Sequence, residues 1–67
     1  MNIEVRDDTD TIISTGMMTE MGPFFSPTLP ADIHSAFGQY IAENSHKQSG
    51  TWEGDSGGKH YRIRFAN

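Results

Sequence analysis

The chain has 67 residues, a formal net charge of −4 and no cysteine, so disulfides and thiolate metal sites are excluded and we expect one domain over residues 1–67. The negative charge gives little support to general phosphate binding, which requires a basic surface. Neither an apolar run long enough to span a membrane nor a basic-then-apolar leader is evident, which favours a cytoplasmic protein without membrane contact.

The N-terminal part of the chain predicts two antiparallel strands. Residues 2–7 alternate between polar and apolar side chains, as is typical of a half-buried strand. Residues 7–10 (DDTD) suit a turn, and residues 11–15 (TIIST) are rich in β-branched side chains. We therefore expect a hairpin, with Gly16 ending or bulging its second strand.

In residues 17–29 (MMTEMGPFFSPTL), the three methionines either continue a strand or form a short helical turn, and the residues after them predict an irregular segment. The Gly-Pro, Ser-Pro and Leu-Pro pairs that begin within it bias their first residues away from helix and forbid long regular structure. Phe24 and Phe25 either plug the end of the core, the commoner outcome in small domains, or stay exposed as a docking surface. The methionines nearby could extend that surface, because methionine adapts to irregular contacts: Met17, Met18 and Met21.

Residues 30–45 carry the sustained helical pattern of the chain. Pro30 suits the first turn, Asp32 lies near the positive end of the helix dipole, and His46 would lie near the negative end. Apolar side chains at positions i, i+3, i+4, i+7 and i+8 form one stripe: Ile33, Ala36, Phe37, Tyr40 and Ile41. Burying this stripe alone does not offset the entropy of ordering the helix, so the helix must pack against a sheet or a partner.

The C-terminal part predicts a second hairpin. Residues 59–65 alternate between basic and apolar side chains, and a shorter run around Trp52 can pair with them across a glycine-rich loop. The fold class is therefore α+β, with an antiparallel sheet of two hairpins (ββ-loop-α-ββ) packed against one helix at about 30–45. The expected core is Ile3, Val5, Ile12 or Ile13, Phe37, Tyr40, Ile41, Trp52, Tyr61, Ile63 and Phe65.

Charge is uneven along the chain, with acidic residues in the first third and basic residues in the last ten. The simplest explanation is that the two ends lie side by side and partly neutralise each other. If the first and last strands are neighbours, Glu4 can face Arg62 or Arg64 on the open side of the sheet.

The string GDSGG at residues 54–58 resembles the sequence around the nucleophilic serine of chymotrypsin-like proteases. Such an enzyme also needs a histidine base, an orienting aspartate and two barrels, which a chain of this length cannot build. We therefore interpret these residues as a hairpin loop with glycines at positive φ. No two of His34, His46 and His60 have i, i+4 spacing, so we expect no metal site. Because the sequence also has no cofactor motif, cysteine or credible triad, we expect no cofactor and no enzymatic activity.

Three surfaces remain as candidates. The acidic residues Glu4, Asp7, Asp8, Asp10 and Glu20 either form solvated loops or bind a basic protein surface. The cluster of Met17, Met18, Met21, Phe24 and Phe25 is either core or interface. The basic strand residues Lys59, His60, Arg62 and Arg64 could bind single-stranded nucleic acid, although the aromatic residues of that strand point the other way.

The sequence thus favours a non-catalytic module that binds another protein through the acidic and Met/Phe surfaces. Small, acidic, cysteine-free chains are common among inhibitors or modulators of other macromolecules, including phage-encoded proteins that act against host defence. The alternative is a nucleic-acid-binding module that uses the basic C-terminal strand. A homodimer whose second copy covers the Met/Phe segment is a third hypothesis.

Overall fold

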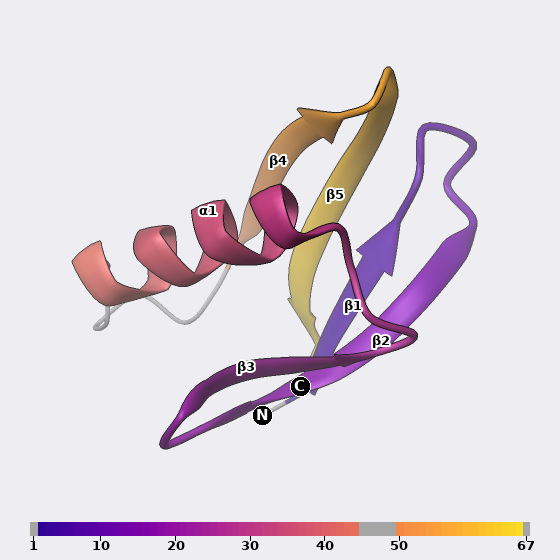
Figure 1. Cartoon of the computed structure of the whole chain (residues 1–67). Coiled ribbons are helices and arrows are strands. Elements are labelled where there is room, and N and C mark those ends of the chain that lie inside the picture. The colour runs from indigo at the N-terminus through magenta and orange to yellow at the C-terminus, as the bar shows by residue number, and fades with distance from the viewer. Residues whose placement is uncertain (1, 45–49, 67) are drawn as a thin grey trace.

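The computed structural model describes residues 2–44 and 50–66, and the expectation for His46 lies outside them. The elements, in chain order, are β1 (Asn2–Arg6), β2 (Ile12–Thr19), β3 (Gly22–Ser26), α1 (Ala31–Glu43), β4 (Thr51–Ser56) and β5 (Lys59–Ala66). The strands form one antiparallel sheet in the order β3-β2-β1-β5-β4 (Figure 1). The predicted α+β class is confirmed, with the helix inside the predicted range.

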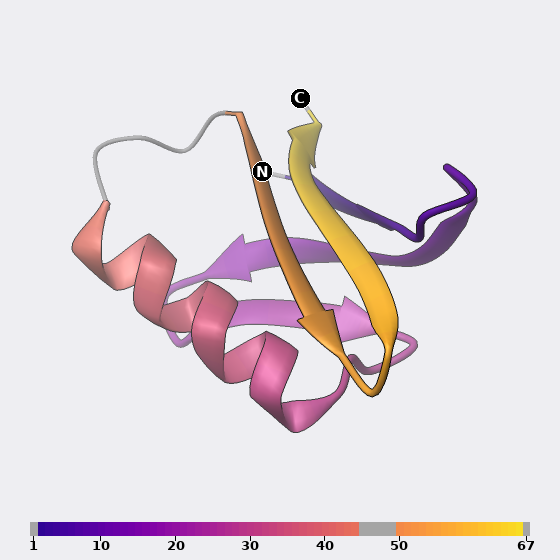
Figure 2. The same cartoon turned by 90° about the horizontal axis from the view of Figure 1, so that it is seen from above.

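The first and last strands are neighbours at the centre of the sheet, as the charge pattern predicts. Val5 lies opposite Ile63, and Glu4 lies opposite Arg64. Arg64 Nη2 donates to Glu4 Oε1 at 3.4 Å, so the expected cross-strand ion pair is present. Figure 2 shows the start of β1 next to the end of β5.

The sheet has five strands, one more than the sequence predicts, because the segment expected to be irregular is largely strand. β2 continues through Gly16 to Thr19, and β3 pairs with it from Gly22 to Ser26. β3 is an edge strand, where the missing N–H of Pro23 is tolerated. Gly22, at φ 110°, supplies the positive φ in the tight β2–β3 turn. Met17 and Met18 thus continue a strand, which is one of the two predicted alternatives. The predictions of an irregular segment at residues 22–26 and of a strand that ends or bulges at Gly16 were wrong, because the register is continuous there.

The core lies between α1 and one face of the sheet, where α1 packs against β4 and β3. Ile13 packs against this core while Ile12 is 46% exposed, which decides between the two predicted alternatives. Phe25 is buried, whereas the adjacent Phe24 is 59% exposed, so the predicted aromatic pair is split between core and surface. The buried apolar residues are Ile3, Val5, Phe25, Ile33, Phe37, Ile41, Tyr61 and Ile63.

Phe37 is the centre of an aromatic cluster. It has no exposed surface, and its ring centroid lies 5.9 Å from that of Phe25 on β3 and 5.8 Å from that of Trp52 on β4. Tyr40 and Phe65 complete the shell at 6.4 Å and 6.0 Å. One helix residue thus connects both edges of the sheet.

The GDSGG string contains the predicted hairpin turn, but residues 54–56 belong to β4 instead of the loop. Gly57 and Gly58 are the two turn residues, with φ of 58° and 78°, which is the conformation of a type I′ turn. Ser56 Oγ donates to the carboxylate of Asp32, with oxygens at 2.7 and 2.9 Å. The serine hydroxyl therefore attaches the hairpin to the start of α1, and its hydrogen-bond partner is an aspartate where a catalytic serine would need a histidine.

No helix formed by residues 2–44 and 50–66 combines the length and the apolar character needed to cross a membrane.

Candidate functional site

The sheet face opposite the helix is the candidate functional surface, here called the open face. Side chains of paired residues point to the same face, so one row crosses all five strands: Ser26, Thr15, Glu4, Arg64 and Thr51. Within the described chain, the only helix packs on the other face. The open face carries two hollows of different chemistry, one charged and one apolar.

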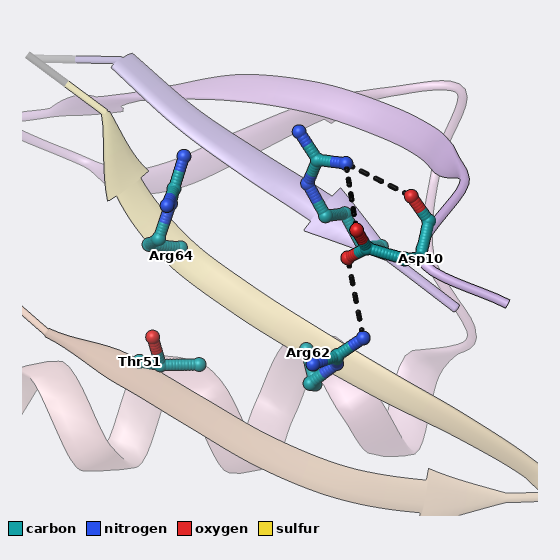
Figure 3. A pocket seen from close by; sticks show the side chains of 5 residues that line it. Asp10, Thr51, Arg62 and Arg64 are labelled. Atoms are coloured by element: carbon teal, nitrogen blue, oxygen red, sulfur yellow. Dashed lines mark hydrogen bonds and ion pairs between the residues drawn. The ribbon is translucent and has the colours of Figure 1, made fainter. Parts of the chain in front are cut away.

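The charged hollow, here called the arginine pocket, has a volume of about 280 Å³ (Figure 3). Its lining residues are Arg6, Asp10, Thr51, Arg62 and Arg64. Arg6 and Arg62 are direct partners on β1 and β5, where two like charges would repel each other. The carboxylate of Asp10 lies between them, 3.7 Å from Arg6 Nη1 and 3.2 Å from Arg62 Nη2.

A second carboxylate continues this network toward the centre of the open face. Glu4 Oε1 accepts hydrogen bonds from Arg6 Nε at 3.3 Å and from Arg6 Nη2 at 3.2 Å, in addition to its bond from Arg64. Acidic and basic groups thus alternate from Arg64 to Arg62. Single exposed ion pairs contribute little, but a connected network holds its side chains in defined positions.

The β1–β2 turn places Asp10 over the arginines. Asp7 Oδ1 accepts hydrogen bonds from Thr9 N at 2.9 Å, Thr9 Oγ1 at 2.6 Å and Thr11 N at 3.1 Å. These bonds, above all the one from the Thr9 hydroxyl, lower the pKa of Asp7 below its ordinary value. Asp10 has a φ of 65°, and its backbone carbonyl accepts from Arg6 Nη1 at 2.8 Å. Asp7 is therefore a structural residue of the turn, and Asp10 is part of the pocket.

His60 lies further along the open face, between two carboxylates of β4. Its Nδ1 is 2.8 Å from Asp55 Oδ1, and its Nε2 is 2.7 Å from Glu53 Oε1. Both ring nitrogens face acceptors, so the doubly protonated imidazolium satisfies both contacts. The hydrogen bond to Asp55, followed by that to Glu53, raises the pKa of His60 above its ordinary value.

This arrangement predicts a pH-dependent contribution of His60 to stability. Because the folded-state pKa is raised above the ordinary 6.5, the contribution is fully present below pH 6.5 and is lost as the pH rises through the folded-state value. We expect the difference in unfolding free energy between the parent and His60→Gln to shrink over that rise, measured by urea unfolding. A difference that grows with pH would contradict the assignment, and the same series with His34→Gln serves as the control.

The apolar hollow lies on the β2–β3 side of the open face and has a volume of about 390 Å³. Its lining residues are Thr15, Gly16, Met17, Phe24, Phe25 and Ser26. Met17 and Phe24 are cross-strand partners, 51% and 59% exposed. Met21, at the adjacent turn, is 90% exposed, whereas Met18 packs against the core. We call Met17 and Phe24 the apolar pair.

The structure does not gather the five acidic residues proposed from the sequence. Glu4 and Asp10 belong to the arginine network, and Asp7 is bound within its turn. Asp8 is exposed in the β1–β2 turn, and Glu20 is exposed in the β2–β3 turn, which lies at the other end of β2. The five acidic residues therefore form no single surface: Glu4 lies on β1, and the other four lie in two separate turns.

The basic strand residues lie where the alternation of β5 predicts. Arg62 and Arg64 line the arginine pocket, His60 is held by β4, and Lys59 Nζ lies 5.8 Å from the ring centroid of Tyr61. Arg6 also lines the pocket, although it was not predicted as a site residue. Its position on the polar side of the first strand, two residues after Glu4, was the available signal.

Among residues 2–44 and 50–66, no group of three or more histidine, cysteine, aspartate or glutamate side chains is placed to hold a metal ion. Comparison with protein-family models, with curated proteins and with solved structures finds no match to the chain. Function must therefore be argued from the open face itself.

Proposed function

We propose that the chain is a non-catalytic protein-binding module whose partner contacts the open face at the apolar pair. The observation that carries this proposal is the exposure of Met17 and Phe24 side by side on a sheet face that α1 does not cover. Aromatic and methionine side chains are enriched at protein interfaces, and contiguous exposed apolar groups are uncommon elsewhere.

The shape of the apolar hollow indicates the chemistry of the partner. A volume of about 390 Å³ suits one or two apolar side chains, and hydroxyls of Thr15 and Ser26 lie at its border. We infer a protein that inserts apolar side chains between Met17 and Phe24. Binding then inhibits or modulates that partner, the role suggested by the small, acidic composition; a phage protein that counters host defence is one case of this type.

Affinity purification with mass spectrometry tests the proposal when the bait is compared with variants. We expect Phe24→Ser to weaken recovery of the partner about tenfold or more, because truncating a central aromatic contact commonly costs at least that. Ile12→Ser is the matched control. Ile12, on β2, is like Phe24 a half-exposed apolar residue, but it lies outside the hollow. A partner retained equally by Phe24→Ser, or no partner above background, would overturn the proposal.

A second copy of the chain is the competing occupant of the apolar pair. Light scattering over a range of concentrations is expected to give the monomer mass of 7.5 kDa. A mass that doubles with concentration, and that returns to the monomer value in Phe24→Ser, would replace the external partner with a homodimer.

The nucleic-acid alternative receives less support from the geometry. His60, Arg62 and Arg64 each contact a carboxylate of this chain, which leaves too little positive charge for a strand that presents several phosphates at once. We expect no shift of labelled single-stranded DNA or RNA at low salt. A salt-sensitive shift that disappears in the Arg62→Ala/Arg64→Ala double variant would favour the alternative.

A further inference from the structure

We propose that the arginine pocket is a binding site for an oxyanion, a carboxylate or phosphate group held by Arg62 and Arg64 with Thr51 at its border. The site lies on β4 and β5 and is separate from the apolar pair on β2 and β3. It can therefore bind an anion whether or not a protein occupies the apolar hollow.

The charge balance of the pocket favours an anion. Three guanidinium groups line it, against one carboxylate, that of Asp10. Glu4 contacts Arg6 and Arg64 from outside the lining and reduces the surplus to one positive charge. Glu53, the cross-strand partner of Arg62, has its carboxylate at His60. The three guanidinium groups and the two carboxylates thus leave one positive charge in surplus, shared over the network.

The hydrogen-bonding capacity of the arginines points to the same place. All three nitrogens of the Arg6 guanidinium already donate hydrogen bonds: Nε and Nη2 to Glu4, and Nη1 to Asp10. Within the described chain, Arg62 and Arg64 each make a single hydrogen bond through Nη2, at 3.2 and 3.4 Å. A guanidinium has five N–H donors in a fork that matches carboxylate and phosphate oxygens. Residues 2–44 and 50–66 therefore leave most donors of these two groups without an acceptor.

Arg62 and Arg64 arise from the same face of β5, although the Arg62 guanidinium is turned toward Asp10 and the Arg64 guanidinium toward β1, so an anion that binds both must draw them together. Arg62 and Arg64 are two residues apart on β5, so their Cα atoms are roughly 7 Å apart and their side chains share a face. Thr51 is the cross-strand partner of Arg64 and adds a hydroxyl from β4 (Figure 3). An anion between the two guanidinium groups can accept from both.

Asp10 demonstrates that this face accepts a carboxylate between two arginines. Its two oxygens contact Arg6 and Arg62, one on each side. The corresponding place between Arg62 and Arg64 has no carboxylate of the described chain spanning both groups, because Glu4 contacts only Arg64 of the two. An external oxyanion there would repeat the Asp10 arrangement one step along β5.

The test is a titration of the isotope-labelled full chain with sodium phosphate and, separately, sodium acetate at constant ionic strength. Arginine Nε–Hε signals in NMR spectra report on binding. We expect saturable shifts at Arg62 and Arg64, and about tenfold weaker binding in Arg64→Gln, the typical effect of losing a charge-assisted contact. Lys59→Gln is the matched control, because it removes the same charge from the same strand outside the pocket.

The outcomes separate the sources of the anion. Saturation by phosphate alone assigns a phosphate-bearing ligand, and saturation by acetate alone assigns a carboxylate. Arg64→Lys, which keeps the charge but loses the fork, should bind with intermediate affinity. Shifts that rise linearly with both salts, or equal weakening by Lys59→Gln and Arg64→Gln, would overturn the site. Loss of the protein contact in Phe24→Ser has no bearing on this result.

Discussion

The Phe37→Ala variant is expected to be severely destabilised, with a urea unfolding transition at much lower urea or none at all. Phe37 is completely buried, and its ring contacts four other aromatic rings from α1, β3, β4 and β5. Truncating a buried phenylalanine to alanine costs about 3–5 kcal/mol. A domain of 67 residues has a total stability of roughly 3–10 kcal/mol, so this loss removes between about a third of that stability and all of it.

Urea unfolding followed by far-UV circular dichroism and by fluorescence of Trp52, the single tryptophan, measures the effect. Phe24→Ala is the matched control, because the same atoms are removed from a side chain that is 59% exposed. We expect the control to change the unfolding free energy by less than about 1 kcal/mol. Similar values for the two variants would contradict the central role of Phe37.

Replacing Gly16 with alanine is expected to be the second most damaging change. A Cβ at this position would meet the backbone carbonyl oxygen of Phe24 and would lie 2.8 Å from Phe25 Cδ1. Backbone cannot move aside as a flexible side chain can, so β3 must shift away from β2. Overpacking of this kind costs about 1–3 kcal/mol. The close approach also explains why a glycine stands inside a strand.

Gly38→Ala is the control for the glycine substitution. Gly38 lies in α1, and nothing would lie within 4 Å of an added Cβ. Alanine should therefore stabilise the helix by up to about 1 kcal/mol. Urea midpoints of the two variants should move in opposite directions. An unchanged midpoint in Gly16→Ala would show that β3 accommodates the methyl group freely.

The parts of the fold that the sequence predicts are those with an uninterrupted period. The alternation in β1 and β5 and the apolar stripe of α1 each have one solution that buries their apolar side chains. β3 was not predicted, because its proline and glycine resemble a loop and only its place at the sheet edge permits a strand. The fates of Phe24 and Phe25 follow from the β2–β3 register, which the sequence does not reveal.

The candidate site was predicted only in part, for a similar reason. Arg62 and Arg64 were recognised from the alternation of the last strand, which also places them on one face. The direction of Asp10 depends on its positive φ and on the bonds that Asp7 makes within the turn. A periodic pattern does not reveal such local geometry. The sequence DDTD at residues 7–10 therefore does not indicate which carboxylate reaches the arginines.

The central pairing of β1 with β5 has a consequence for how the chain folds. Glu4 and Arg64 bond across a sequence separation of 60 residues, so the middle of the sheet closes only when β5 reaches β1 across all of the intervening elements. Until then, one hydrogen-bonding edge of β1 has no partner strand. The folding rate should therefore be limited by the closure of this long loop, as expected for topologies of high contact order.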